Sequence, residues 1–311
     1  MRTLITGADG FLGANLARYL LAQGHTVVGA ALNRKGSTSL DALGVTVRLE
    51  YGDITDSAYV ARLLNAYEVE VVYHLAAVSI VRIAERDPGR ALRTNILGTL
   101  NVCEAAQRAG ALVLVASSDK AYGDQGGQAY VEDMALRPTG AYEVSKASAD
   151  MIARLFGAVV VRAANLYGPA DFAWSRLVPN SCRLVCQGKA PAVWGDAATN
   201  QREWLHVEDA CAAYALLAER GQQSSAYNVG SGEQATALDV ARQIARYADV
   251  PQPALVEKAR SYYEIPSQAL DCRKVGALGW APEWRLGDGL RQTLGWYERH
   301  LCGRVGVGVS A

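Results

Sequence analysis

The stretch LITGADGFLGANLARYL, residues 4–20, sets three glycines between an apolar strand-like run and an amphipathic helix-like run. Gly7 allows a tight turn, Gly10 lets the backbone approach a pyrophosphate, and Gly13 allows close packing of the helix on the strand. The start of the helix would face the phosphates with its free N–H groups. Because the glycines follow a strand and open a helix, the stretch predicts a dinucleotide-binding turn rather than an ordinary cluster of turn glycines.

Strand-like and helix-like runs alternate through the first half of the chain. This alternation predicts an α/β fold with a doubly wound parallel sheet of the Rossmann type. The less regular second half predicts a smaller C-terminal substrate-binding domain. We expect a dinucleotide-binding domain over 1–168, with a returning segment near 203–230, and a mainly substrate-binding domain over 169–311. The expected strands are 3–6, 26–31, 45–50, 69–74, 112–116 and 159–162, and the expected helices are 13–23, 59–66, 91–109, 141–156, 177–187, 207–220 and 237–248.

The composition argues against several classes of protein. Half of the 311 residues are apolar, and 31 Lys and Arg balance 31 Asp and Glu. A net charge of zero gives no reason to expect nucleic acid as a partner, and no apolar stretch is long enough to span a bilayer. The N-terminus enters a strand and a turn directly, without the pattern of a signal peptide. We therefore expect a cytoplasmic enzyme.

The six cysteines and four histidines are scattered along the chain. Cys182 and Cys186 are four residues apart and could share a helix face, but a zinc site would need two further close ligands. Buried free thiols are the better interpretation, so we expect neither a metal site nor a disulfide.

The end of the second strand bears on the choice of dinucleotide. An acidic residue at this point typically binds the ribose of NAD, and here the run continues with Ala31, Leu32, Asn33, Arg34 and Lys35. The missing acid removes one reason to exclude a 2′-phosphate, which Arg34 could bind. Arg34 and Lys35 could equally be solvated loop charges. The sequence thus weakly favours NADP and leaves NAD open.

Tyr142 and Lys146 lie four residues apart in a helical pattern, which puts both on one face. A phenol is a poor base at neutral pH, and a lysine cation nearby is expected to lower its pKa. Tyr142 could then exchange a proton with a carbinol oxygen while a nicotinamide exchanges hydride.

A third polar group, SSDKAYG at residues 117–123, follows the apolar run 111–116. Strand ends are where α/β enzymes place their chemistry. The adjacent carboxylate and amine of Asp119 and Lys120 are therefore candidate catalytic groups, although two solvated loop residues would look the same.

Together these motifs resemble the extended short-chain dehydrogenase/reductase family, and within it the nucleotide-sugar epimerases, dehydratases and reductases. The resemblance covers almost the whole chain. SSDKAYG, DFAWSRLVPN (171–180) and LDCRKVGALGWAPEW (270–284) are most similar to CDP-glucose 4,6-dehydratases, whereas AYEVSKAS (141–148) and YNVGSGEQAT (227–236) also resemble GDP-4-keto-6-deoxymannose reductases. Further stretches that carry the resemblance are YGDITD, VVYHLAA, TNILGTLNVCEAA, RAANLYGP, QREWLHVEDA and LGWAPEW.

The resemblance implies a role for each matching position. Ser118 would bind the sugar 4-oxygen, Tyr142 would be the base, and Lys146 would also hold the nicotinamide ribose. His206 would pack rather than react. The remaining cofactor residues would be Gly7, Gly10, Phe11, Leu12, Gly13, Asn33, Arg34, Asp53, Ile54, Leu75, Ala76, Ala77 and Asn95, with Asp53 on the adenine. The substrate residues would be Ser118, Asn165 at the sugar diphosphate, and Arg176, Arg202 and Arg260 at the nucleotide.

The resemblance also implies a reaction, a nucleotide-sugar 4,6-dehydration in which Asp119 is the general acid and Lys120 the base at C5. That chemistry requires Asp119 to hold its proton and Lys120 to be neutral, and their adjacency works against both. In a 4-epimerase or 4-ketoreductase the two would be polar loop residues. A non-catalytic NAD(P)-binding regulator would have no use for Ser118, Tyr142 and Lys146. We further expect a homodimer formed through the helices over 91–109 and 141–156.

Overall fold

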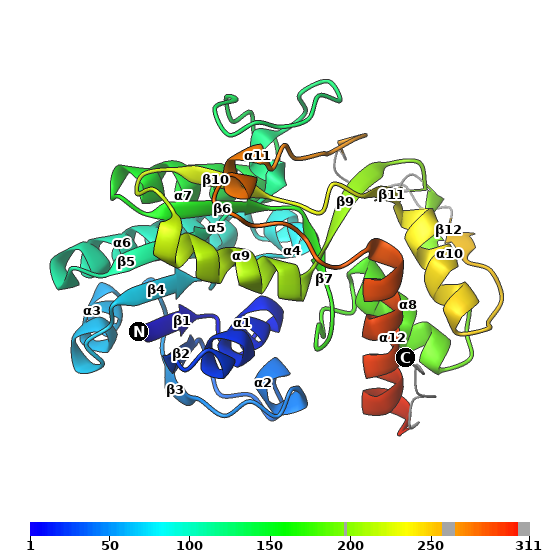
Figure 1. Ribbon diagram of the computed structural model, residues 1–311, viewed down its shortest axis with the longest axis horizontal. Coiled ribbons are helices and arrows are strands. Elements are labelled where there is room, and N and C mark those ends of the chain that lie inside the picture. The colour runs from blue at the N-terminus through cyan, green and yellow to red at the C-terminus, as the bar shows by residue number, and fades with distance from the viewer. Residues whose placement is uncertain (196–197, 257–264, 304–311) are drawn as a thin grey trace.

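A computed structural model describes residues 1–195, 198–256 and 265–303, and its centre is a parallel sheet (Figure 1). The strand order is β10-β6-β5-β4-β1-β2-β3, and every neighbouring pair is parallel. The order reverses between β1 and β4, which is where doubly wound sheets bind ligands. The strands are β1 (Arg2–Thr6), β2 (Thr26–Ala31), β3 (Arg48–Tyr51), β4 (Val71–His74), β5 (Leu112–Ala116), β6 (Val159–Ala163) and β10 (Ala226–Val229).

Helices cover both faces of this sheet, because successive strand residues point to opposite sides and both sides are apolar. Leu4 belongs to the core on one face and Ile5 to the core on the other, and both are fully buried. One face is covered by α1 (Phe11–Ala22) and α9 (Val207–Arg220), and the other by α3 (Ser57–Ala66), α6 (Gly98–Ala109) and α7 (Ala141–Leu155). The predicted doubly wound α/β fold is confirmed.

A smaller lobe packs beside the carboxyl ends of the strands (Figure 1). Its three long helices share a core of their own. Residues 201–229 return from this lobe to the main sheet, where β10 becomes its seventh strand. The predicted domain boundary at residue 168 stays a prediction. The elements of the lobe are β7 (Asn165–Tyr167), α8 (Leu177–Cys186), β8 (Ala192–Trp194), β9 (Gln201–His206), β11 (Gln234–Thr236), α10 (Ala237–Tyr247), β12 (Ala254–Val256) and α12 (Leu286–Cys302).

The helix expected over 91–109 is not uniform. It begins as α5 (Pro88–Leu92), continues through a π-helical turn, η1 (Arg93–Leu97), and becomes α6. Within the turn, Asn95 is buried, accepts a hydrogen bond from the Val78 backbone N–H at 2.7 Å and donates to Ser145 Oγ at 2.8 Å. π-Helical turns inside helices often occur at functional sites, and this one connects the segment after β4 to α7. The other short elements are α2 (Ser39–Ala42), α4 (Val81–Arg86), the 3₁₀ turn η2 (Asp119–Tyr122) and α11 (Arg273–Gly276).

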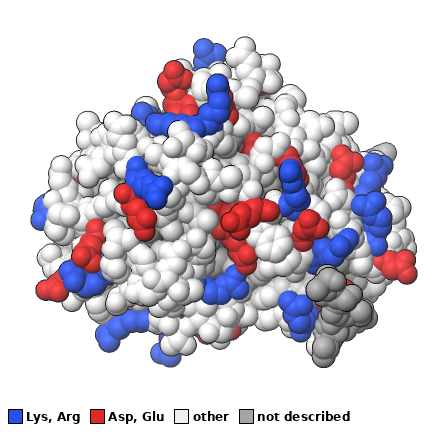
Figure 2. Space-filling model, viewed as in Figure 1, with Lys and Arg blue, Asp and Glu red and all other residues white. Residues whose placement is uncertain are grey.

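Acidic and basic side chains are interspersed over the described part of the face in Figure 2. Within the described residues, no helix combines the length and apolarity needed to cross a membrane. All six cysteines are free thiols. The described part of the chain contains no group of three or more His, Cys, Asp or Glu side chains that could hold a metal ion.

The position of α1 depends on a close backbone approach at the glycine loop. A Cβ at Gly13 would lie 2.3 Å from the Gly7 carbonyl oxygen, which is far inside any real contact. Gly7 itself has a φ of +72°, a conformation that favours glycine, and lies against the backbone of Ala76. A side chain at Gly13 would therefore push α1 away from the loop, and one at Gly7 would press on the backbone after β4.

We predict that Gly13→Ala destabilises the protein by about 1–3 kcal/mol or more, because the new methyl group must displace backbone. Gly36→Ala is the matched control, since a Cβ there meets nothing within 4 Å, and it should stay within about 0.5 kcal/mol of the parent. Denaturant unfolding measures both. Equal stability of the two variants would contradict the packing described for α1.

Candidate active site

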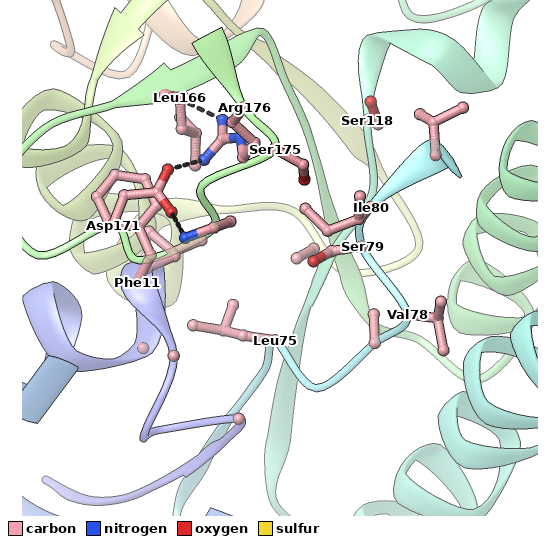
Figure 3. Close-up of a pocket in the computed structure, with 18 of the residues that line it drawn as sticks. Phe11, Leu75, Val78, Ser79, Ile80, Ser118, Leu166, Asp171, Ser175 and Arg176 are labelled. Carbon is pink, nitrogen blue, oxygen red and sulfur yellow. Dashed lines mark hydrogen bonds and ion pairs between the residues drawn. The ribbon is translucent and has the colours of Figure 1, made fainter. Parts of the chain in front are cut away.

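A cleft of about 1590 Å³ runs along the carboxyl ends of the strands and into the smaller lobe. The glycine loop and Phe11 line one side of it, and Ser118 lies on the other (Figure 3). Most of the predicted site residues meet in this cleft although they are scattered over the chain. Those that line it are Gly7, Gly10, Phe11, Leu12, Gly13, Asp53, Ile54, Leu75, Ala76, Ala77, Ser118, Lys120, Tyr142, Lys146, Asn165, Arg176 and Arg202.

The glycine-loop end of the cleft fits a dinucleotide. Helix α1 starts after Gly10, whose position provides no side-chain cap, so the first N–H groups of the helix are left for an anionic ligand. At the end of β3, Asp53 lines the cleft and spends one carboxylate oxygen on the Thr55 N–H at 2.8 Å. The contact of Asp53 with the adenine that the resemblance implies stays a prediction.

Three predicted cofactor residues lie outside the cleft lining. Asn33 and Arg34 are exposed in the loop after β2, and Asn95 is buried where it holds Val78. Lys35 lines the cleft instead and forms a 2.5 Å ion pair with Asp9 of the glycine loop. Any contact of Asn33 or Arg34 with a cofactor stays a prediction.

Tyr142 and Lys146 lie one turn apart near the start of α7, and both are buried against the cleft. Lys146 Nζ donates to the Ala116 carbonyl at 2.8 Å, which ties α7 to the end of β5. Burial lowers the pKa of Lys146 to about 8. The expectation that Lys146 lowers the Tyr142 pKa is not met in this structure: burial raises the pKa of Tyr142 to about 12, and a hydrogen bond to Ser118 opposes that rise.

Asp119 is buried, with an exposed fraction of 2%, and lies behind Ser118 and Lys120 rather than in the cleft lining itself. Its Oδ1 accepts from Ser118 Oγ at 2.9 Å, and its Oδ2 has no hydrogen-bond partner among the described residues. Burial raises the pKa of Asp119, while the nearby charges of Lys120 and Arg202 work in the opposite direction. A buried carboxyl with one unpaired oxygen is a group that can hold a proton for transfer.

Lys120 is half-buried and lines the cleft beside Ser118. Its backbone N–H donates to Ser118 Oγ at 3.2 Å, whereas its Nζ donates to Gln268 Oε1 at 3.1 Å. The side chains of Asp119 and Lys120 thus have different partners, and no ion pair between them is found in the described structure.

The predicted substrate residues lie toward the smaller lobe. Arg176 forms an ion pair with the buried Asp171, donates to the Leu166 carbonyl and lies over the Phe11 ring (Figure 3). Asn165 lines the cleft with a buried Nδ2 that has no partner among the described residues. Arg202 is buried on β9 and also lines the cleft. Arg260 lies outside the described residues.

Several site residues were not found from the sequence. Gln268 carries no motif of its own, and it reaches the site only because a distant segment folds against it. Asp171 lies in the quoted stretch DFAWSRLVPN, but its ion pair with Arg176, five residues on, was not predicted. Trp174 and Trp194 line the lobe side of the cleft, where a base or sugar face could pack. Trp174 lies in the quoted stretch DFAWSRLVPN but was not singled out, and Trp194 lies in no quoted stretch. His206 is buried and accepts from the Glu208 N–H at 3.4 Å, which agrees with the expected packing role.

The model of the NAD dependent epimerase/dehydratase family matches residues 3–230. The chain belongs to this family. It is 34% identical over 317 residues to the dTDP-glucose 4,6-dehydratase of Streptomyces griseus, covering 96% of this chain and 94% of that protein. The predicted family membership, an enzyme group of the extended short-chain dehydrogenase/reductase type, is confirmed.

Solved structures of family members have the same fold. The dTDP-glucose 4,6-dehydratase of Streptomyces venezuelae, crystallised with NAD, superposes with a TM-score of 0.88 at 28% identity, over 97% of this chain and 98% of that one. The UDP-glucose 4-epimerase of Thermus thermophilus, also in complex with NAD, has a TM-score of 0.86 at 27% identity, over 96% and 99% of the two chains. The fold of this chain is therefore similar both to a dehydratase and to an epimerase.

The buried Lys146 makes a prediction about stability and pH. Its pKa is about 8 in the folded protein against an ordinary value of 10.5, so the unfolded chain binds the proton more tightly. Between these values the unfolded state holds more protons, and the contribution of Lys146 to the free energy of unfolding rises with pH. Denaturant unfolding of the parent and Lys146→Met at pH 7.5 and pH 9.5 should show the parent gaining stability relative to the variant. An unchanged difference would contradict the burial of an ammonium group here.

Proposed function

We propose that this protein is an NAD(P)-dependent nucleotide-sugar 4,6-dehydratase. The observation that carries the proposal is the turn after β5, where Ser118, a buried Asp119 with an unpaired carboxylate oxygen, and Lys120 lie together beside the cleft. An oxidation at C4 would use Tyr142, Lys146 and Ser118, without Asp119 or Lys120. A further acid and base at the same site are what the removal of water across C5 and C6 requires.

The first step would use Tyr142, Ser118 and Lys146. A bound oxidised nicotinamide supplies a hydride acceptor and a positively charged ring. Ser118 would hold the sugar 4-oxygen while Tyr142 takes the proton of the C4 hydroxyl. Lys146, held against the Ala116 carbonyl, would bind the nicotinamide ribose. Burial raises the pKa of Tyr142, and a positively charged nicotinamide ring beside the phenol would lower it.

The second step would use Asp119 and Lys120. Once C4 is a ketone, the C5 proton becomes acidic, and Lys120 would remove it. Asp119 would give its proton to the C6 hydroxyl, which leaves as water. The burial of Asp119 supports this role because it favours the protonated form, and the contact of Lys120 with Gln268 supports separate duties for the two neighbours.

The proposed substrate is a nucleotide-diphosphate sugar. Arg202 provides positive charge on the lobe side of the cleft, the guanidinium of Arg176 lies there in its ion pair with Asp171, and the unpaired Nδ2 of Asn165 provides a further donor. These are the groups that a diphosphate requires. Arg260 would add a contact from the segment outside the described residues. A cytoplasmic location remains part of the proposal.

We also propose a homodimer formed through the expected helices over 91–109 and 141–156. Exposed apolar side chains on this surface support it, since Met151 is 53% and Leu155 81% exposed on α7, and Leu97 is 41% exposed in η1. Large exposed apolar residues on neighbouring elements are typical of association surfaces.

The choice between NAD and NADP turns on Arg34. The proposal keeps the weak preference for NADP that Ala31 and Arg34 suggest. We predict that Arg34→Ala raises the dissociation constant for NADP more than that for NAD, because only NADP carries the 2′-phosphate. Lys35→Ala is the control that breaks the ion pair with Asp9 instead. Equal weakening of both cofactors by Arg34→Ala, or strict NAD preference in the parent, would contradict the NADP assignment.

The dehydration itself is tested with nucleotide sugars and mass analysis for the loss of water. Substrate deuterated at C4 should give product labelled at C6. Lys120→Met should still form the 4-ketosugar but lose exchange of the C5 proton with D₂O. Asp119→Asn should keep that exchange and fail to lose water. Each loss should be about 10²–10⁴-fold, whereas Tyr142→Phe should block the first oxidation.

Two outcomes would overturn the proposed reaction. Return of the label to C4 with inverted configuration would make the protein an epimerase, and stoichiometric consumption of NADPH on a 4-ketosugar would make it a reductase. In either case Asp119 and Lys120 would have no chemical duty, although the family and its Tyr142–Lys146 pair would stand.

A further inference from the structure

A segment from the end of the chain supports the turn that carries Lys120. Residues 265–271 run past η2, and within them Gln268 is 1% exposed. Gln268 Oε1 accepts a hydrogen bond from Lys120 Nζ at 3.1 Å, across 148 residues of sequence. Gln268 does not line the cleft, and Lys120 is the cleft-lining residue that its side chain contacts.

The backbone around Gln268 is held independently of Lys120. Its N–H donates to the Gln201 carbonyl at 3.2 Å, and the Gln201 N–H donates to the Pro266 carbonyl at 2.8 Å. Two residues further on, the Leu270 N–H donates to the buried carboxylate of Glu203 at 2.8 Å. The backbone that carries Gln268 is therefore fixed independently of Lys120, and the side-chain amide is buried, with its Oε1 on Lys120 and its Nε2 without a hydrogen-bond partner among the described residues.

The charged surroundings of Lys120 make the neutrality of this partner important. Of its neighbours, Asp119 is held toward its protonated form by burial, and Lys146 and Arg202 are basic. The titratable and charged groups around the turn are Asp119 and Tyr122 on η2, Tyr130 beside the Gln268 segment, Tyr142 and Lys146 on α7, Arg162 on β6, and Arg202 and Glu203 on β9. Arg162 is paired with Asp150 at 2.8 Å, and Glu203 accepts from the Gly232 and Leu270 backbone N–H groups.

An amide suits an amine that must work without its charge. Its oxygen accepts from an N–H of either the ammonium or the neutral amine, so it holds Lys120 in both states. A carboxylate at the same place would favour the ammonium strongly, since an opposite charge in contact stabilises the charged form. Because the Gln268 amide carries no charge, it does not stabilise the ammonium form of Lys120 in the way that a carboxylate would.

We propose that Gln268 is a positioning residue for the dehydration, which holds Lys120 at C5 without supplying the negative charge that would keep its amine protonated. This inference rests on the proposed function. In the step concerned, the Lys120 amine takes the C5 proton and the C5–H electron pair forms the C5–C6 double bond. The C6–O bond breaks as Asp119 protonates the hydroxyl, and water leaves.

The decisive variant is Gln268→Glu, which keeps the shape of the side chain and adds the charge. The acid limb of the pH profile for water loss, followed in single turnovers by mass analysis, should move up by at least about one pH unit. At pH 7 the rate should fall about tenfold and recover as the pH rises. Formation of reduced cofactor in the first oxidation should be unchanged.

Two controls separate charge from packing. Gln268→Met removes the hydrogen bond without adding charge, so it should slow water loss at every pH and leave the limb in place. Gln234→Glu disturbs the same segment, because Gln234 Nε2 donates to the Gln268 carbonyl at 3.0 Å, but it puts its carboxylate outside the contact with Lys120. It should not move the limb either.

The failures of the two proposals are distinguishable. If Lys120→Met retains C5 exchange and water loss, the proposed dehydration pair is wrong. If Lys120→Met abolishes them but Gln268→Glu leaves the acid limb where it is in the parent, the positioning role of Gln268 is wrong and the dehydratase proposal stands.

Discussion

The contact on which the structure depends is the close approach of backbone at Gly7 and Gly13. It brings α1 down onto the strands at the point where the strand order reverses, with no side chain between them. Because α1 starts at this contact, its free N–H groups face the cleft rather than solvent. The same close approach puts Gly7 against the backbone of Ala76 after β4. The glycine loop and the segment after β4, which both line the dinucleotide end of the cleft, are therefore positioned against each other.

Burial also shapes the site, because it disfavours the charged form of acids and of bases alike. Removing water penalises the charged form, so the pKa of Asp119 is raised and that of Lys146 is lowered. Both groups are thereby moved toward their neutral forms near physiological pH. A buried carboxyl such as Asp119 that favours its protonated form can act as a proton donor, which suits a reaction that moves several protons.

The two elements that carry the candidate catalytic groups are joined by a buried polar network behind the cleft. Arg162 on β6 is 1% exposed and donates to Asp150 of α7 at 2.8 and 3.0 Å. It also donates to the hydroxyl of Tyr122 in η2 at 2.8 Å. Helix α7 and the turn after β5 are thus held to one strand, which keeps Tyr142 and Lys146 in register with Ser118, Asp119 and Lys120. A buried, fully paired network of this kind favours one arrangement over alternatives.

The sequence alone determined the parts of this protein that rest on local pattern. The glycine loop, the alternation of strands and helices, the Tyr142–Lys146 spacing and the polar turn after β5 could all be found in it, because each is set by residues close together in the chain. Tertiary structure decided what depends on distant segments. Gln268 beside Lys120, Lys35 rather than Arg34 at the cleft and the rise of the Tyr142 pKa all follow from contacts or burial that no short stretch encodes. The physical reason is that desolvation and long-range pairing belong to the assembled core, whereas turn and helix geometry belong to the local chain.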